Sequence, residues 1–349
     1  DAYEEPTIKR SRSHNYVSKE VINVRENVGI IEVANFSKHE FKGPDARKFL
    51  DHIMAGKLPK PGRISLSPML SYRGKLYGDL TVSCLNENEF MVFGSGAAQE
   101  MHRRWFESHL EKFNLDYKNR SDEFHGLSIA GPKSREVLEK VVRENVSNNK
   151  FKFRDSRRMY VAGVPAIINR ISFTGELGYE IYVAPHYQIK LYEELMNAGK
   201  EFNIKPFGSR ALMSMRLEKN WGAWTLDYRP DFTAKETGLD KFINWDKEFI
   251  GKESAKKDNS QSKLVPLMVE TNDIDVTYNE AVLKGDKSIG YVTSGGFAHF
   301  VNKSVAFSYL NTKELNSEKG IQVEINGDLF NCLIIKEPLY DPSGQKMRS

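Results

Sequence analysis

The chain has 349 residues, of which 40% are hydrophobic and 28% charged, and its 51 Lys and Arg against 47 Asp and Glu give a formal net charge of +4. A chain of this length exceeds what one hydrophobic core usually organises, so two or three domains are expected, and the composition is that of a folded globular protein. Basic and acidic residues are interspersed, which argues against the concentrated basic face of a nucleic-acid-binding protein and is compatible with an anionic small ligand.

Cysteine content and hydropathy indicate the compartment. Cys84 and Cys332 are the only cysteines, and their apolar, strand-like surroundings argue against a disulfide framework or a cysteine-ligated zinc. No apolar run approaches the roughly 20 residues that span a bilayer, and the polar first residues lack the apolar core of a signal peptide. We expect a protein of a reducing compartment, the cytoplasm or alternatively the mitochondrial matrix, with no membrane partner. The chain does not start with Met, which is compatible with processing or with a longer parent polypeptide.

The first predicted unit, residues 1–122, is an α+β domain. Its expected elements, in chain order, are strands at "GIIEVA" and "HEFKG", a helix at "GPDARKFLDHIM", strands at "GRISLSPML" and "GKLYGDLTVSCLNENEFMVFGS", and a helix at about 96–113. The last strand pair is joined by the turn "NENE", which predicts a hairpin.

A second α+β unit is predicted over 123–262 and an all-β unit over 263–349. In the second unit, strands such as "GLSIAG", "PAIINRISF" and "YEIYVA" mix with helices without regular βαβ alternation, which favours antiparallel sheets. A polar stretch rich in Lys and Ser, "SAKKDNSQSK", reads as a linker, and only strand patterns follow it.

One glycine motif resembles a dinucleotide-binding turn without matching its fingerprint. Gly94 and Gly96 follow a strand and precede a helix, as in a dinucleotide-binding turn, but the fingerprint needs Gly or Ala at the sixth position, where this chain has Gln99. The preceding strand also resembles half of a hairpin. We therefore interpret the motif as a strand-to-helix turn.

Three charged residues are candidates for chemistry. Asp79 lies on the polar face of the alternating strand "KLYGDLTVS", where Asp is disfavoured, so that face is either solvated or lines a cavity in which Asp79 is a poised carboxylate. Arg216 lies on one stripe of the helix "SRALMSMRLEKN" and is either solvated, paired or functional. Glu176 stands between Gly175 and Gly178, which let the backbone turn tightly or let a planar ligand approach it.

Histidine spacing offers no metal site: the eight histidines show no ligand pattern, and His299 in "GGFAHF" is interpreted as structural.

These pieces together resemble the aminomethyltransferase family of folate enzymes, the glycine-cleavage T-protein group, and most closely the folate-binding half of dimethylglycine and sarcosine dehydrogenases. The resemblance runs through nearly the whole chain in order. It is carried by the segments "VGIIEVANFSKHEFKGPDARKFLD", "GRISLSPMLSYRGKLYGDLTV", "IAGPKSREVLEK", "RISFTGELGYEIYV", "FGSRALMSMRLEKNWGAW", "TGLDKFINWDKEFIGKES" and "IGYVTSGGF".

The resemblance implies a fold, a cofactor and a site. The fold is a clover leaf of two α+β domains with antiparallel sheets and a C-terminal β-barrel-like domain around tetrahydrofolate. Asp79 matches the essential aspartate of the family, while Glu176 and Arg216 match its pterin-site glutamate and arginine. Six further positions fall where the family places residues that line the pocket: Phe36, Leu66, Met91, Phe93, Ser95 and Phe173.

The implied activity is tetrahydrofolate-dependent capture of the one-carbon unit from N-demethylation of a methylated amine, with 5,10-methylenetetrahydrofolate as product. Two enzymatic alternatives stay open, glycine-cleavage aminomethyl transfer and demethylation of another small methylated compound, and a non-catalytic folate-binding subunit is the third. FAD enters only if a separate or missing flavoprotein domain or subunit supplies it. The segment "WGAWTLDYRPDFTAKETG" departs from the family pattern, which places the substrate in doubt more than folate binding.

Overall fold

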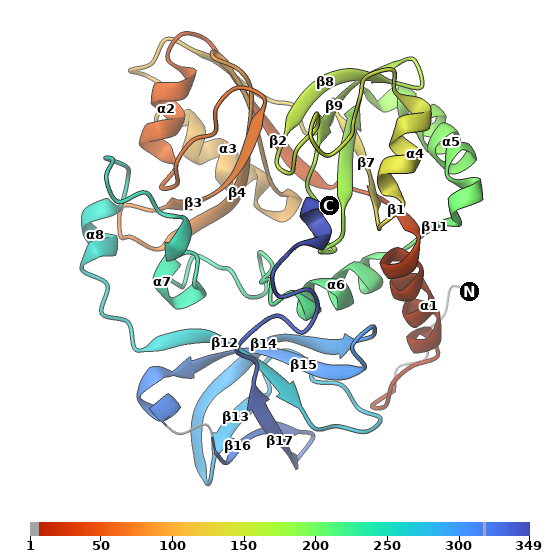
Figure 1. Cartoon of the computed structure of the whole chain (residues 1–349). Helices are drawn as coiled ribbons and strands as arrows, with labels where there is room; N and C mark the ends of the chain where they lie inside the picture. The colour runs from red at the N-terminus through yellow and green to blue at the C-terminus, as the bar shows by residue number, and fades with distance from the viewer. Residues whose placement is uncertain (1–6, 317–318) are drawn as a thin grey trace.

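The structure is a computed structural model that describes residues 7–316 and 319–349. Within them the strands form a six-stranded sheet, a five-stranded sheet and a closed barrel, grouped around the centre of the molecule (Figure 1). No described helix is long and apolar enough to cross a membrane. The expected fold class, two α+β units and a C-terminal barrel, is confirmed.

The five-stranded sheet has the order β3-β4-β5-β2-β6, and all its pairs are antiparallel. Its strands are β2 (Phe36–Lys42), β3 (Arg63–Leu70), β4 (Leu76–Asn86), β5 (Glu89–Ser95) and β6 (Asp116–Asn119). Helices α2 (Ala46–Ile53) and α3 (Gln99–Glu107) pack on one face, and η1 (Gly96–Ala98) precedes α3. The turn at Gly94 and Gly96 thus follows an antiparallel strand, and a side chain at Gly96 would collide with the carbonyl oxygen of Asn35.

The six-stranded sheet has the order β11-β1-β7-β10-β9-β8, with one parallel pair, β1 with β11. Its strands are β1 (Val28–Glu32), β7 (His125–Ala130), β8 (Ser156–Val161), β9 (Val164–Asn169), β10 (Gly178–Val183) and β11 (Ile204–Pro206). Helices α4 (Ser134–Val141) and α5 (Gln188–Ala198) bury their apolar residues on one face. Two short turns, η2 (Pro185–Tyr187) and η3 (Lys200–Phe202), flank α5.

The sheets do not follow the contiguous boundaries expected for residues 1–122 and 123–262. Strand β1 pairs with β7, and Val28 and Ile30 join the core of the six-stranded sheet. Helix α1 (Ser13–Glu26) packs beside α6 (Ser209–Glu218) rather than against the five-stranded sheet. Alternation identifies a strand but not its partner, which is set by long-range pairing.

The linking segment after α6 returns to the five-stranded sheet. It contains α7 (Ala234–Thr237), η4 (Asp240–Phe242) and α8 (Lys252–Lys256). Residues of this segment share a core with Leu70 and Leu76.

The barrel begins at Ser262 and is closed in the order β12-β15-β14-β13-β16-β17. Its strands are β12 (Ser262–Val269), β13 (Ala281–Lys284), β14 (Lys287–Ala298), β15 (Lys303–Asn311), β16 (Ile321–Ile325) and β17 (Asp328–Ile334). The 3-10 turn η5 (Thr312–Asn316) follows β15, and η6 (Lys346–Arg348) lies beyond the barrel, close to Asn148 and Arg170. Figure 1 shows α6 between the barrel and the upper sheets, and the segment after β17 running back into the middle of the molecule.

Candidate functional site

The two sheets meet through the faces that their helices leave uncovered. On β4, Leu80 and Val82 point into the core with α2 and α3, so Asp79, Thr81 and Ser83 occupy the other, inner face. The Ser83 hydroxyl donates to Ser156 Oγ on β8 at 2.5 Å. The inner face of β4 therefore looks toward the six-stranded sheet.

Aromatic and apolar side chains fill part of this contact. The Phe93 ring on β5 stacks on Tyr182 of β10 with 4.6 Å between centroids, and Met91 and Ile167 belong to the same cluster. Because Phe93 is registered opposite Thr81, the stack lies beside the strand that carries Asp79.

Asp79 is a partly exposed carboxylate on this inner face. No described Lys or Arg forms an ion pair with it, and burial raises its pKa from 3.8 to about 7. Asp79 also influences Tyr228. The pKa of the Tyr228 phenol is raised first by burial and second by the negative charge of Asp79. A carboxylate with these properties can exchange a proton near neutral pH.

Glu180 is a second carboxylate on the facing sheet, and the sequence interpretation missed it. It lies opposite Asn169 in the β9–β10 pairing, on the same face as Tyr182, and it is 8% exposed. The Tyr182 hydroxyl donates to Glu180 Oε2 at 2.8 Å, whereas Oε1 accepts no hydrogen bond from any described residue. Burial raises the pKa of Glu180 to about 7. A weaker signal was available, since Glu, as in the strand "GYEIYV", is depleted in strands to a lesser degree than Asp.

Glu176 does not stand open between its glycines. Its Oε1 accepts from Arg25 Nη1 at 2.9 Å and from the Tyr340 hydroxyl at 2.5 Å, and the residue is 1% exposed. Gly175 has φ of +85°, as a tight turn requires, but a side chain there would lie 2.7 Å from the Lys219 methylenes. The space beside the turn is filled by the protein, so this geometry does not support the expected pterin contact of Glu176.

Arg216 binds protein groups through both terminal nitrogens of its guanidinium. Its Nη1 donates to Asp227 Oδ2 at 2.8 Å and to the Trp221 carbonyl at 3.0 Å, and its Nη2 donates to Ser294 Oγ on β14 at 2.9 Å. Only Nε lacks a partner among the described residues. Arg216 therefore ties α6 and residues 221–228 to the barrel, and its assignment to the pterin site stays a prediction.

The expected pocket-lining residues divide into two places. Five lie on inner faces of the five-stranded sheet: Phe36, Leu66, Met91, Phe93 and Ser95. Leu66 is registered opposite Thr81 and stays 37% exposed, which leaves apolar surface near Asp79. Phe173 lies in the turn before β10 and stacks on Trp221 with 5.8 Å between centroids.

Residues 221–233 lie next to the start of β4, the strand that carries Asp79. Trp224 and Tyr228 pack against the cluster that contains Leu76, three residues before Asp79, and Leu76 N donates to the Phe232 carbonyl at 2.7 Å. Asp227 orders this segment, because it also accepts from Ala223 N and from the Thr293 and Ser294 hydroxyls. The segment that departs from the family pattern therefore borders the site.

Comparison with known proteins agrees with this architecture. Residues 1–247 match the GCVT N-terminal domain, and residues 263–341 match the glycine cleavage T-protein C-terminal barrel domain. The mitochondrial dimethylglycine dehydrogenase of Homo sapiens is 35% identical over 97% of this chain but 40% of its own length. The aminomethyltransferase of Thermoanaerobacter pseudethanolicus is 28% identical over 93% of this chain and 89% of its own length.

A solved structure shows the same fold. The glycine cleavage system aminomethyltransferase T of Bartonella henselae superposes with a TM-score of 0.84 at 22% identity, covering 93% of this chain and 90% of that one. By contrast, the chain spans only 40% of the length of the human dimethylglycine dehydrogenase. Both family domains are matched in order, and the protein belongs to the glycine-cleavage T-protein family, GCVT.

Proposed function

We propose that the chain is a tetrahydrofolate-dependent one-carbon transferase, which captures the one-carbon unit released by N-demethylation of a methylated amine such as dimethylglycine or sarcosine and forms 5,10-methylenetetrahydrofolate. One observation carries the proposal. Asp79 and Glu180, two carboxylates whose pKa values are raised to about 7, lie on facing inner faces of the two sheets, beside aromatic and apolar side chains.

The residues present fit a reduced folate. A pterin edge offers a ring N–H beside an exocyclic amine, and a carboxylate can accept from both. Glu180 has a free acceptor oxygen for this contact, and Leu66 and Phe173 offer apolar and aromatic surface for the ring. When bound, the folate supplies the nitrogens that receive the one-carbon unit.

Asp79 is assigned the chemical role. Its carboxylate stabilises a cationic amine or iminium and accepts the proton that ring closure releases, which requires the ionised form. The pKa of the Tyr228 phenol is raised first by burial and second by the charge of Asp79, so we propose that Tyr228 lies beside the methylated substrate at this carboxylate.

Comparison of relatives supports the dehydrogenase type over glycine cleavage. Identity is 35% to dimethylglycine dehydrogenase and 28% to the aminomethyltransferase. A flavoprotein domain or partner is proposed as the source of the one-carbon unit, by analogy with the dehydrogenase. Release of ammonia from an aminomethylated lipoyl carrier would instead identify glycine cleavage.

The test uses tetrahydrofolate with formaldehyde as the one-carbon donor. Stopped-flow absorbance measures the rate at which 5,10-methylenetetrahydrofolate forms, and the uncatalysed rate is subtracted. We expect Asp79→Asn to lower the rate by about 10²- to 10⁴-fold, as loss of a positioned base does. Asp286→Asn, in an exposed turn of the barrel, is the control. An Asp79→Asn protein with wild-type turnover would refute the mechanism, and folate binding without turnover by the wild type would favour a non-catalytic subunit.

A further inference from the structure

The segment after β17 connects the barrel to the six-stranded sheet across α6. Its Tyr340 N donates to the Glu218 carbonyl at 3.0 Å, and Lys219 Nζ donates to the Asp341 carbonyl at 2.6 Å. Further along, Arg170 Nη2 donates to the Ser349 carbonyl at 2.6 Å. Residues 336–349 therefore form a strap, which Figure 1 shows as the dark blue segment that rises from the barrel to the upper sheets.

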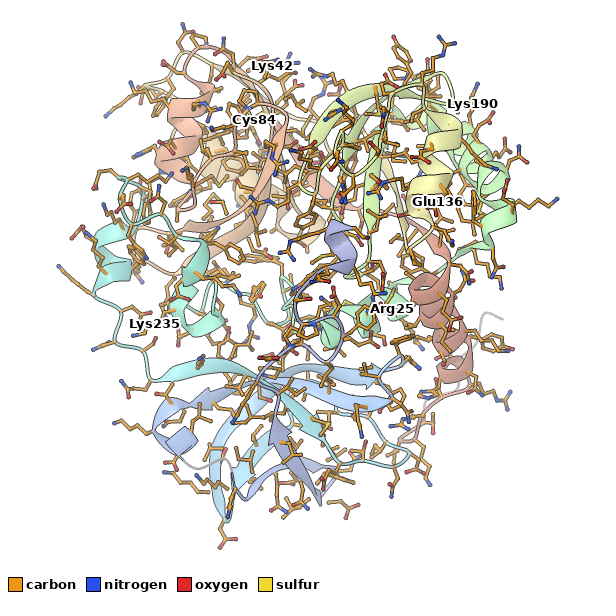
Figure 2. All side chains as sticks on the ribbon, in the orientation of Figure 1. Arg25, Lys42, Cys84, Glu136, Lys190 and Lys235 are labelled. Atoms are coloured by element: carbon orange, nitrogen blue, oxygen red, sulfur yellow. The ribbon has the colours of Figure 1, made fainter. Side chains whose placement is uncertain are left out.

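The Tyr340 side chain completes a buried charge network at the centre of the strap. The Arg25 guanidinium lies 3.8 Å above the Tyr340 ring, and the Tyr340 hydroxyl donates to the same Glu176 oxygen that pairs with Arg25. Arg25 Nη2 also pairs with Glu218 at 2.6 Å. Arg25, labelled in Figure 2, thus joins α1, the turn of Glu176, α6 and the strap.

The network holds the turn over residues 172–178 from three sides. Arg25 Nη1 donates to the Thr174 carbonyl at 2.7 Å, Lys219 methylenes cover Gly175, and Tyr340 and Arg25 bind Glu176. This turn carries Phe173, which stacks on Trp221, and it ends where β10 begins, two residues before Glu180.

We propose that Tyr340 is a positioning residue for folate. It acts through Glu176 and Arg25, fixing the turn that presents Phe173 and aligns the start of the strand of Glu180. The strap then sets folate affinity without touching the ligand, and it has no part in the proton transfer at Asp79. This inference rests on the proposed function.

The test is Tyr340→Phe, which keeps the ring beneath Arg25 and removes only the hydroxyl. We expect the KM and Kd for tetrahydrofolate to rise about tenfold, as loss of one charge-assisted hydrogen bond allows. The kcat at saturating folate and its pH profile stay unchanged, because Asp79 is untouched. In a double-mutant cycle, Glu176→Gln adds little to Tyr340→Phe, since both act on one hydrogen bond.

Two controls separate positioning from simple destabilisation. Tyr278→Phe, at an exposed tyrosine, keeps wild-type affinity, and Val282→Ala, in the barrel core, lowers the Tm without changing KM. A Tyr340→Phe protein with wild-type KM, or with a loss of kcat as large as its rise in KM, overturns the inference while the proposed function stands. A wild-type chain that binds no tetrahydrofolate overturns both.

Discussion

At the scale of single residues, environment decides what each acidic side chain can do. Glu176 is buried but paired with a guanidinium, whereas Asp79 and Glu180 are desolvated without an ion pair among the described residues. Desolvation without compensation raises a carboxyl pKa, and groups of this kind concentrate at functional sites. The sequence identified Asp79 because Asp is rare inside strands, but it favoured Glu176 over Glu180. Nothing local marks the pairing of Glu176, because Arg25 is 151 residues away in the chain.

The pH profile of turnover follows from the state of Asp79. Its pKa is raised to about 7, and its proposed role needs the ionised form, so kcat/KM falls as pH decreases through 7. We expect an inflection near pH 7 in the acid limb for the wild type, measured with tetrahydrofolate and formaldehyde. Asp79→Glu keeps an ionisable group and shifts this inflection. A wild-type profile flat from pH 5 to 8 would contradict the assignment.

The two glutamates give different results when each is changed to Gln. Glu180→Gln replaces one proposed acceptor oxygen by a donor, so we expect folate affinity to fall by about 2 to 4 kcal/mol with the fold intact. Glu176→Gln leaves Arg25 with one weaker partner, so we expect a lower free energy of unfolding together with only the roughly tenfold loss of folate affinity expected of Tyr340→Phe. Fluorescence titration with tetrahydrofolate and urea unfolding separate the two. Equal effects of both variants on affinity at equal stability would restore Glu176 as a pterin contact.

At the scale of elements, alternation identified most strands, and it failed where pairing is non-local. The sequence pattern places strand β1 in the first unit, yet its partners in the structure are β7 and β11. The helix expected over 96–113 divides into η1 and the shorter α3, which ends at Glu107. The stripe of α6 that holds Arg216 was recognised, but its partner Asp227 lies in an irregular segment without periodicity.

That segment depends on Asp227 for its structure. Asp227→Asn leaves Arg216 buried beside a neutral side chain, and we expect the free energy of unfolding to fall by about 3 to 5 kcal/mol, as when a buried pair loses one partner. Asp231→Asn, in the same segment with a mostly exposed side chain, is the matched control and changes stability by less than about 0.5 kcal/mol. Equal stability of the two variants in urea unfolding would show that the Arg216–Asp227 pair does not anchor the segment.

At the scale of the whole molecule, two sets of buried groups change the free energy of unfolding in opposite directions as pH changes. Burial lowers the pKa of His39 to about 3 and those of His102 and His299 to about 4. As pH falls below about 6.5, these histidines bind protons in the unfolded chain but not in the folded one, so the free energy of unfolding decreases. Asp79 and Glu180 have raised pKa values, so their ionisation destabilises the fold as pH rises from about 4 to 7. Between pH 4 and 6.5 the two slopes have opposite signs.

In a variant without both acids, the pH dependence of the free energy of unfolding is therefore set mainly by the buried histidines. We expect the double variant Asp79→Asn, Glu180→Gln to match the wild type near pH 4 and to exceed its free energy of unfolding by about 2 to 6 kcal/mol at pH 8, since each unit of pKa shift corresponds to about 1.4 kcal/mol and partial solvation reduces the total. Urea unfolding at pH 4.5, 6 and 8 measures the difference. The double variant Asp286→Asn, Asp231→Asn removes two exposed acids and should run parallel to the wild type. A gain at pH 8 that also persists at pH 4.5 would mean that better packing, rather than relief of two desolvated charges, stabilises the variant, and the chemical case for the two facing carboxylates would fail with it.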